Sequence, residues 1–371
     1  SRKWGATICT HHVSHCHAQY LPMSQRPLLT VCIPAYNRAD LLAPLLESIL
    51  TQDFDDFDVL ICEDGSPERV AIAGAVQRFQ QMHPGRVHYE ENAVNLGYDG
   101  NIRRLVERTN GQYCVFMGND DLLCAGALAS IAASIQRQPD CGVVVRTYAS
   151  FEKSPDQVKQ VFRYFPQEHK LPAGAQAVFT AYRRSVVISG MVIHRDAAIA
   201  VATSRFDGTL LYQLYLVGMV LTHRSVVFVP QIIALRRDGT PPDFGNSATE
   251  RGKFVPHDQT PDSSIHFMRG MLKIAQHVES ATQLDVFSTI RADIGNYSYP
   301  ILSIQAKRPL HVYVKYGLNL ARLGLWRSPL FHLYFLVLLL IGPDRADHII
   351  NMIKRRLGST PRLGAVRKGN R

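Results

Sequence analysis

From residue 28 to about residue 150, short apolar runs alternate with stretches in which apolar residues recur at helical spacing. The first run, LLTVCI at 28–33, is rich in β-branched residues and ends at Pro34, which is typical of a buried strand. A helix is expected at 41–50, with Asp40 placed to cap it. The same pattern predicts strands at 57–62, 87–89, 113–117 and 142–146, and helices at 70–81, 100–108 and 125–136. This alternation predicts an α/β fold with a mostly parallel sheet covered by helices on both faces.

Beyond residue 151 the pattern is less regular, and it predicts two further regions. Residues 151–260 are expected to form a smaller half built from longer loops, and 236–253, RRDGTPPDFGNSATERGK, is expected to be a flexible loop. Residues 261–371 are expected to be helical. Their most apolar run, 330–341, is shorter than the about 20 residues that cross a bilayer. It is therefore expected to lie on a membrane surface, which its basic flanks favour, or in a core.

The charge of the chain indicates which partners it could bind, and its cysteines indicate the compartment. The formal net charge is +10, and basic residues gather after Pro343, which suits an anionic membrane surface. Nucleic acid is not expected as a partner, because no RNA- or DNA-binding signature is visible. Cys32, Cys62, Cys114 and Cys141 lie in apolar runs and are expected to be buried thiols. We therefore expect a reduced, cytoplasmic protein, peripherally associated with the inner face of the cell membrane.

Residues 1–22 are expected to be a disordered extension that does not belong to the fold. They have neither the apolar core of a signal peptide nor the periodicity of a helix. Their crowded histidines match none of the spacings of a closed metal site. The first folded region is accordingly predicted at 23–150.

Two adjacent carboxylates, Asp120 and Asp121, follow the strand predicted at 113–117. Carboxylates just beyond the carboxyl end of a buried strand cannot contribute to a core, and a divalent metal is the cation that suits them best. A metal beside a nucleotide-binding sheet in turn indicates a diphosphate. The alternative is that Asp120 caps the helix that follows.

Several motifs in order, TVCIPAYNRADLL, VLICEDGSPERV and NLGYDGNIRRLVERTNGQYCVFMGNDDLL, resemble the nucleotide-diphospho-sugar transferase fold (GT-A) of family 2 glycosyltransferases. The resemblance covers about residues 28–146 and, within the family, is greatest to abequosyltransferase-like enzymes of bacterial surface polysaccharide assembly. It implies a nucleotide-sugar-binding half at 23–150 and an acceptor-binding half at 151–260. It also implies inverting transfer of a sugar from a nucleoside diphosphate to a saccharide hydroxyl. An acceptor carried on polyprenyl diphosphate would account for a carboxyl end at the membrane surface.

The resemblance further implies which residues bind the nucleotide. Tyr36 would stack on the base and Asp64 would accept hydrogen bonds from its edge, unless Tyr36 merely closes the core and Asp64 merely caps a helix. Asn95 and Asn101 would contact ribose or phosphate at a helix amino end whose tight turn Gly97 permits. The predicted donor-binding residues are Pro34, Tyr36, Asn37, Asp64, Asn95, Gly97, Asn101 and Asp120.

The implied metal is Mg²⁺ or Mn²⁺, held by Asp121, while Asp120 would face hydroxyls of the sugar or ribose. The cation would neutralise the charge that develops on the departing diphosphate. The general base is where the sequence departs from the family: many members have an acidic residue at a later helix start, where FDGTLLYQLYLVG has Gln213. Glutamine cannot act as a base. Asp207 is the predicted base, or else a helix cap, and Asp238, Asp243 and His257 remain further candidates.

Two other functions remain open on the sequence. A sugar nucleotidyltransferase shares the general architecture but needs a Gly-rich loop bearing Lys or Arg after the first strand, where PAYNRAD offers only Arg38. A catalytically inactive nucleotide-sugar-binding protein is favoured by the absence of an acid at Gln213.

Overall fold

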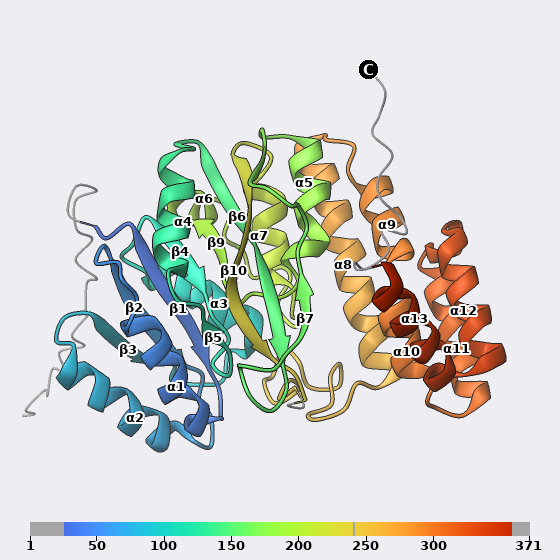
Figure 1. The fold of residues 1–371 in the computed structure, drawn as a ribbon, viewed down its shortest axis with the longest axis horizontal. Helices are drawn as coiled ribbons and strands as arrows, with labels where there is room; N and C mark the ends of the chain where they lie inside the picture. The colour runs from blue at the N-terminus through green and yellow to red at the C-terminus, as the bar shows by residue number, and fades with distance from the viewer. Residues whose placement is uncertain (1–25, 240–241, 358–371) are drawn as a thin grey trace, which may run out of the picture.

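The computed structural model describes residues 26–239 and 242–357 (Figure 1). The expectations for residues 1–22 and for the basic residues after position 357 lie outside the described residues. A central sheet with helices on both faces forms the larger part of the molecule, and a group of helices from the end of the chain lies beside it.

The first part of the chain has the predicted alternation. Its elements are β1 (Leu29–Ala35), α1 (Ala39–Leu50), β2 (Phe57–Glu63), α2 (Arg69–Met82), β3 (Val87–Glu91), α3 (Gly97–Arg108), β4 (Tyr113–Phe116), β5 (Leu122–Leu123) and α4 (Ala127–Gln136). Asp40 lies in the first turn of α1, but Arg38, in the left-handed conformation, is the cap residue and makes no side-chain capping bond. Apolar periodicity thus located the elements, whereas the chemistry of this helix start differs from the prediction.

The second part continues the sheet with longer strands. Its elements are β6 (Cys141–Phe151), β7 (Val158–Phe162), β8 (His169–Leu171), α5 (Ala175–Tyr182), β9 (Met191–His194), α6 (Arg195–Ala200), α7 (Tyr212–Val220) and β10 (Ser225–Arg237). Arg236 and Arg237, which were assigned to the flexible loop, belong to β10. The irregular stretch therefore begins at Asp238.

The strands form one ten-stranded sheet in the order β3-β2-β1-β4-β9-β6-β10-β5, with β7 beside β6 and β8 beside β10. β1 pairs in parallel with β2 and β4, and β2 with β3, as predicted. β9 runs antiparallel to both β4 and β6, whereas β6 and β10 are parallel. The sheet is consequently parallel up to β4 and mixed beyond it. The sequence did not predict the antiparallel strands, because an apolar run gives no indication of strand direction.

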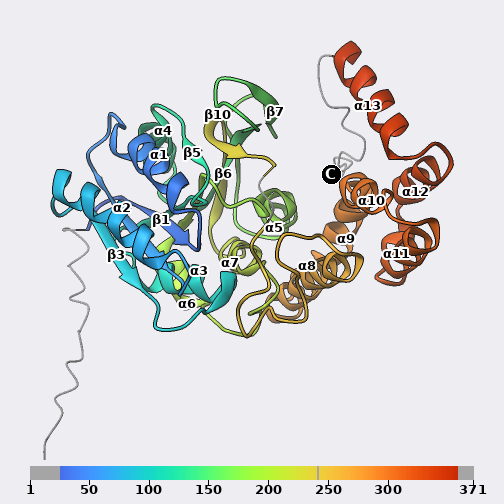
Figure 2. The ribbon, with the colours of Figure 1, turned by 90° about the horizontal axis from the view of Figure 1, so that it is seen from below.

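Helices cover both faces of the sheet, and each face has its own core (Figure 2). Leu45 of α1, Val76 of α2 and Ile131 of α4 pack on one face. On the other face, Leu105 of α3 and Leu214 of α7 pack with α5. Burial of Cys32, Cys62, Cys114 and Cys141 confirms the prediction of buried thiols.

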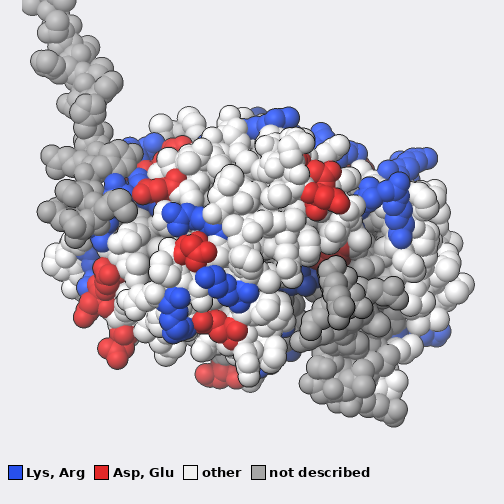
Figure 3. All heavy atoms as spheres, turned by 90° about the horizontal axis from the view of Figure 1, so that it is seen from above, with Lys and Arg blue, Asp and Glu red and all other residues white. Residues whose placement is uncertain are grey.

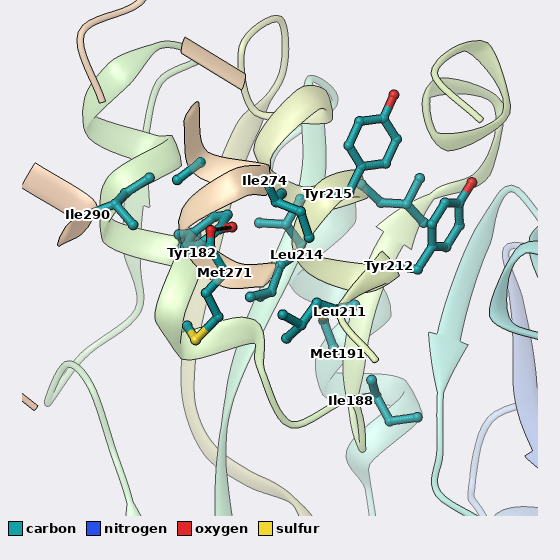
Figure 4. Close-up of a cluster of buried hydrophobic side chains, with 14 of the residues drawn as sticks. Tyr182, Ile188, Met191, Leu211, Tyr212, Leu214, Tyr215, Met271, Ile274 and Ile290 are labelled. Carbon is teal, nitrogen blue, oxygen red and sulfur yellow. Dashed lines mark hydrogen bonds between the residues drawn. The ribbon is translucent and has the colours of Figure 1, made fainter. Parts of the chain in front are cut away.

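The remaining helices are α8 (Pro261–Thr282), α9 (Phe287–Asn296), α10 (Tyr299–Gln305), α11 (Leu310–Arg322), α12 (Pro329–Ile341) and α13 (Pro343–Leu357). Figure 4 shows where this group joins the sheet: Leu214 of α7 lies beside Met271 and Ile274 of α8. The Tyr182 hydroxyl at the end of α5 donates to the Met271 carbonyl at 2.7 Å. These contacts fix α7, whose first turn reaches the site described below.

The surface of the helical region is partly apolar. α12 buries Phe331 and Leu338 but leaves Leu333, Leu336 and Leu340 52%, 50% and 78% exposed. Within the described residues, no helix is both long and apolar enough to span a bilayer. On the face shown in Figure 3, acidic and basic side chains are interspersed, so the net positive charge does not form a continuous basic surface there.

Candidate active site

A cavity of about 550 Å³ opens at the carboxyl ends of β1, β2 and β4. Pro34 lies near the end of β1, Asp64 directly follows β2, and Gly118–Asp121 follow β4. The opposite wall is formed by Val186–Ser189 and by the end of β10. Ligands of open α/β sheets bind in the crevice outside the carboxyl ends of the strands, so this is the expected place for a functional site.

Asp121, after β4, lines the cavity and is 5% exposed. Its carboxylate accepts hydrogen bonds from the Ser189 hydroxyl and, at 2.7 Å, from the backbone N–H of Arg237. Burial, followed by the nearby charge of Asp120, raises the pKa of Asp121 to about 7. The Asp120 carboxylate forms an ion pair with Arg38 at 2.6 Å. Since α4 begins only at Ala127, Asp120 is not its cap.

The donor set of this carboxylate pair fits a magnesium-like cation. Mg²⁺ is commonly held by one or two carboxylates together with substrate phosphates and water, rather than by a cage of protein ligands. Among residues 26–239 and 242–357, no group of three or more His, Cys, Asp and Glu side chains could hold a metal. A cation at Asp121 would therefore take its other ligands from a diphosphate and from water.

Asp64 is 3% exposed and holds the turn before α3. Its carboxylate accepts hydrogen bonds from the backbone N–H groups of Leu96 at 2.8 Å and Gly97 at 2.9 Å, and from the Asn92 amide at 2.8 Å. Burial raises the pKa of Asp64 to about 7, although these bonds oppose the shift. Asp64 thus ties the end of β2 to the start of α3 while its side chain lines the cavity.

The segment after β10 docks onto the same helix end. Glu250 is 3% exposed, and its carboxylate accepts hydrogen bonds from the backbone N–H of Tyr98 at 2.7 Å and of Gly245 at 2.9 Å. Gly97 has φ +79°, and a Cβ there would lie 2.5 Å from the Ser247 hydroxyl oxygen. The backbone N–H groups of Gly97 and Tyr98 at the start of α3 are therefore bonded to carboxylates of the chain itself.

The cavity brings together most of the predicted site. Its wall contains Pro34, Tyr36, Asp64, Asn95, Gly97, Asn101, Asp120 and Asp121. Asn37 is not in the wall, but its amide donates to Asp243, which is, at 2.7 Å. Asn101 is 2% exposed and its amide donates to the Cys62 carbonyl at 3.0 Å, so its NH₂ group already has a partner within the fold.

Asp207, the predicted base, is not brought to the cavity wall. Its two carboxylate oxygens bind Arg103 of α3 at 2.5 and 2.8 Å. It does not cap α7 either, because the N–H groups at that helix start are bonded to Asp99. Gln213 does line the cavity, and its side-chain NH₂ donates to the Val186 carbonyl at 2.9 Å. The bonds between Asp207 and Arg103 fit a structural ion pair rather than a general base.

Several wall residues carried no recognisable signal in the sequence. Ser189 precedes an ordinary apolar run, Arg237 acts through its backbone N–H, and Glu250 belongs to an irregular loop. The Ser189 hydroxyl and the Arg237 backbone reach Asp121, and the Glu250 carboxylate reaches α3, only because distant segments meet at one edge of the sheet. Asp238 and Asp243, named as further candidates for the base, also line the cavity.

Comparison with known families matches residues 30–199 to the family described as glycosyl transferase family 2. The match contains β1–β4, the Asp120–Asp121 pair and Ser189. Residues 30–199, which are 170 of the 371 residues of the chain, thus match glycosyl transferase family 2. This confirms the resemblance drawn from the motifs and the GT-A type of fold.

The chain is also similar to two curated bacterial glycosyltransferases. The chain is 33% identical over 113 residues to abequosyltransferase RfbV of Salmonella typhimurium, covering 30% of this chain and 34% of the relative. It is 29% identical over 105 residues to GalNAc(5)-diNAcBac-PP-undecaprenol beta-1,3-glucosyltransferase of Campylobacter jejuni, covering 28% and 33%. The matched part thus spans about a third of the length of these curated relatives.

Solved structures extend the similarity of fold to most of the chain. Residues 1–349 of S. aureus TarS in complex with UDP superpose with a TM-score of 0.56 at 13% identity, covering 91% of this chain and 94% of that one. The complex of the same protein with UDP-GlcNAc gives a TM-score of 0.54 at 13% identity, covering 90% and 93%. At this identity the likeness concerns the fold alone.

Proposed function

We propose that this protein transfers a sugar, with inversion, from a nucleoside diphosphate to a hydroxyl of a saccharide in bacterial surface polysaccharide assembly. The observation that supports this most is the single cavity in which Tyr36 and Asp64 lie with the Asp120–Asp121 pair at the strand ends of a family 2 domain. Tyr36 and Asp64 suit a nucleobase, and the Asp120–Asp121 pair suits the cation of a diphosphate.

In the proposed reaction Asp121 holds Mg²⁺ or Mn²⁺, which when bound supplies positive charge to the leaving diphosphate. Ser189 and the backbone of Arg237 keep the Asp121 carboxylate in place. Tyr36, Asp64 and Asn95 would orient the base and ribose, with Pro34 and Gly97 shaping the wall around them. Arg38 is placed by its ion pair with Asp120 to face the same anionic group.

The base is proposed to lie in the loop after β10 rather than at Asp207. Asp238 and Asp243 both line the cavity, and their side chains are 19% and 16% exposed. Either could take the proton from an acceptor hydroxyl that approaches from this side. Measuring turnover and nucleotide affinity of Asp238→Asn and Asp243→Asn separates them: loss of the base abolishes turnover and leaves nucleotide affinity unchanged. If both variants keep full turnover, this assignment is wrong.

The acceptor is proposed to be a glycan carried on polyprenyl diphosphate at an anionic membrane surface. The exposed apolar side chains of α12 support this, as does the Campylobacter jejuni relative, whose name includes PP-undecaprenol. Such a surface would place the cavity close to a lipid-linked saccharide.

The donor reaction distinguishes this proposal from its two rivals. Incubating the full chain with a panel of nucleoside diphosphate sugars, Mn²⁺ and an undecaprenyl-diphosphate-linked saccharide should release the nucleoside diphosphate. Asp121→Ala should abolish that release. A nucleotidyltransferase would instead release pyrophosphate from a nucleoside triphosphate and a sugar phosphate. Binding of the donor without release would indicate the inactive binding protein.

A further inference from the structure

A buried arginine lies directly behind the wall of the cavity. Arg146, in β6, is 0% exposed, and none of the carboxylates of the described residues forms an ion pair with it. Burial lowers the pKa of Arg146. An unpaired guanidinium in a core is costly unless its donors are satisfied. The cost of burying this charge therefore depends on the hydrogen-bond partners of Arg146.

Each nitrogen of the Arg146 guanidinium has a hydrogen-bond acceptor in one short segment, residues 184–189. Its Nε donates to the carbonyl of Ser189 at 2.6 Å and its Nη2 to that of Val187 at 2.8 Å, while Nη1 approaches the carbonyl of Arg184 at 3.5 Å. Its guanidinium also lies 4.7 Å from the centre of the Tyr148 ring. Only the rigid fork of a guanidinium can bind several carbonyls in this way, so the segment is held from behind by a single side chain.

The front of the same segment forms part of the cavity wall. Val186–Ser189 line the cavity, and the Ser189 hydroxyl donates to the carboxylate of Asp121. That hydroxyl oxygen also accepts a hydrogen bond from the backbone N–H of Gly118 at 2.9 Å. Ser189 thus connects the two residues: its carbonyl accepts from Arg146, and its hydroxyl donates to Asp121.

We propose that Arg146 is a positioning residue: by bonding to the Ser189 carbonyl it fixes the Ser189 hydroxyl, which orients the Asp121 carboxylate for a divalent cation. The proposal rests on the metal role of Asp121 in the proposed function. Groups that hold a metal ligand in place commonly change metal affinity 10–100-fold when they are removed. No contact between Arg146 and substrate is required.

The test is Mn²⁺ binding to the full chain in the presence of UDP, GDP, CDP, ADP or dTDP, each tested in turn and monitored by the electron paramagnetic resonance signal of the free ion. Ser189→Ala should weaken Mn²⁺ binding about tenfold or more. Ser185→Ala is the matched control, because this buried hydroxyl in the same stretch donates only to the Ala181 carbonyl, at 3.0 Å. It should leave the Mn²⁺ affinity unchanged.

Arg146→Lys keeps the charge but loses the fork, and it should weaken Mn²⁺ binding as well. In the Ser189→Ala background, the same substitution should have little further effect, because the hydroxyl through which Arg146 acts is absent. Losses that add independently would show that Arg146 does not act through Ser189.

Wild-type Mn²⁺ affinity in Ser189→Ala would overturn the proposal, whether or not the Arg146 variant folds. A wild-type protein that binds no Mn²⁺ with any of these nucleotides would instead remove the metal role from the proposed function, and the positioning role with it. The two failures are therefore distinguishable.

Discussion

At the scale of single residues, the site is distinguished by carboxylates that are buried and hydrogen-bonded rather than exposed. Asp64 and Asp121 are 3% and 5% exposed, and burial raises the pKa of each to about 7. Such groups shift toward the neutral form unless a cation or additional donors compensate for the lost hydration. A metal at Asp121 would supply that compensation, which connects the shift to the proposed function.

Asp121→Asn should change how stability depends on pH in metal-free protein. Because the pKa of Asp121 rises from 3.8 to about 7 on folding, its contribution to stability is fully present below about pH 4 and is lost as pH rises through 7. From pH 5 to pH 8, the free energy of unfolding of the wild type should fall relative to that of the variant, on the order of 2 kcal/mol. Urea unfolding with a chelator present measures this, and parallel pH profiles would contradict the burial argument.

At the scale of elements, α3 organises the cavity through bonds to three distant segments. Its amino end is bonded to Asp64 after β2 and to Glu250 after β10, and its own Asp99 holds the start of α7. Asp99 is 1% exposed and accepts hydrogen bonds from the backbone N–H groups of 209–212 at 2.8–2.9 Å. These bonds place Gln213 at the wall.

Asp99→Ala should destabilise the fold because it leaves the buried N–H groups of Leu210, Leu211 and Tyr212 without acceptors. We expect a loss of at least about 3 kcal/mol in the free energy of unfolding, measured with urea. Asp55→Ala is the control, since its side chain is fully exposed, and it should cost less than about 0.5 kcal/mol. Equal losses in the two variants would show that Asp99 does not support α7.

These bonds also explain what the sequence could and could not predict. Apart from the two-residue β5, the elements from β1 to α4 followed from apolar periodicity, and the Asp120–Asp121 pair was recognised from its place after β4. The carboxylate that holds the start of α7 could not be predicted, because Asp99 lies in a different helix, whereas the nearby Asp207 is paired with Arg103. Local sequence identifies candidate carboxylates, but partners that are distant in sequence decide their roles.

At the scale of the whole molecule, the helices after β10 extend the sheet domain on one side (Figure 2). α12 turns Leu333, Leu336 and Leu340 outward, a set of large apolar side chains that a free surface rarely exposes together. The sequence predicted the apolar run at 330–341, but it could not decide between core and surface. In the structure this helix is partly buried and partly exposed.

Replacing Leu333, Leu336 and Leu340 together by Ser should weaken binding to vesicles that contain anionic lipid. Each removes exposed apolar area that would otherwise be buried in the interface, so binding should fall at least tenfold in co-sedimentation. Val70→Ser with Met82→Ser is the control, because these residues are 86% and 61% exposed on α2. Unchanged binding of the α12 variant would contradict a membrane role for this helix.

The central claim is that the cavity at the strand ends binds a nucleoside diphosphate through Tyr36, Asp64 and an Asp121-held cation. A crystal structure with Mn²⁺ and the nucleoside diphosphate released in the donor assay tests it most directly. We expect an anomalous Mn²⁺ peak beside Asp121, in contact with the diphosphate, and the nucleobase between Tyr36 and Asp64. A nucleotide bound outside this cavity, or a Mn²⁺ peak away from Asp121, would contradict it.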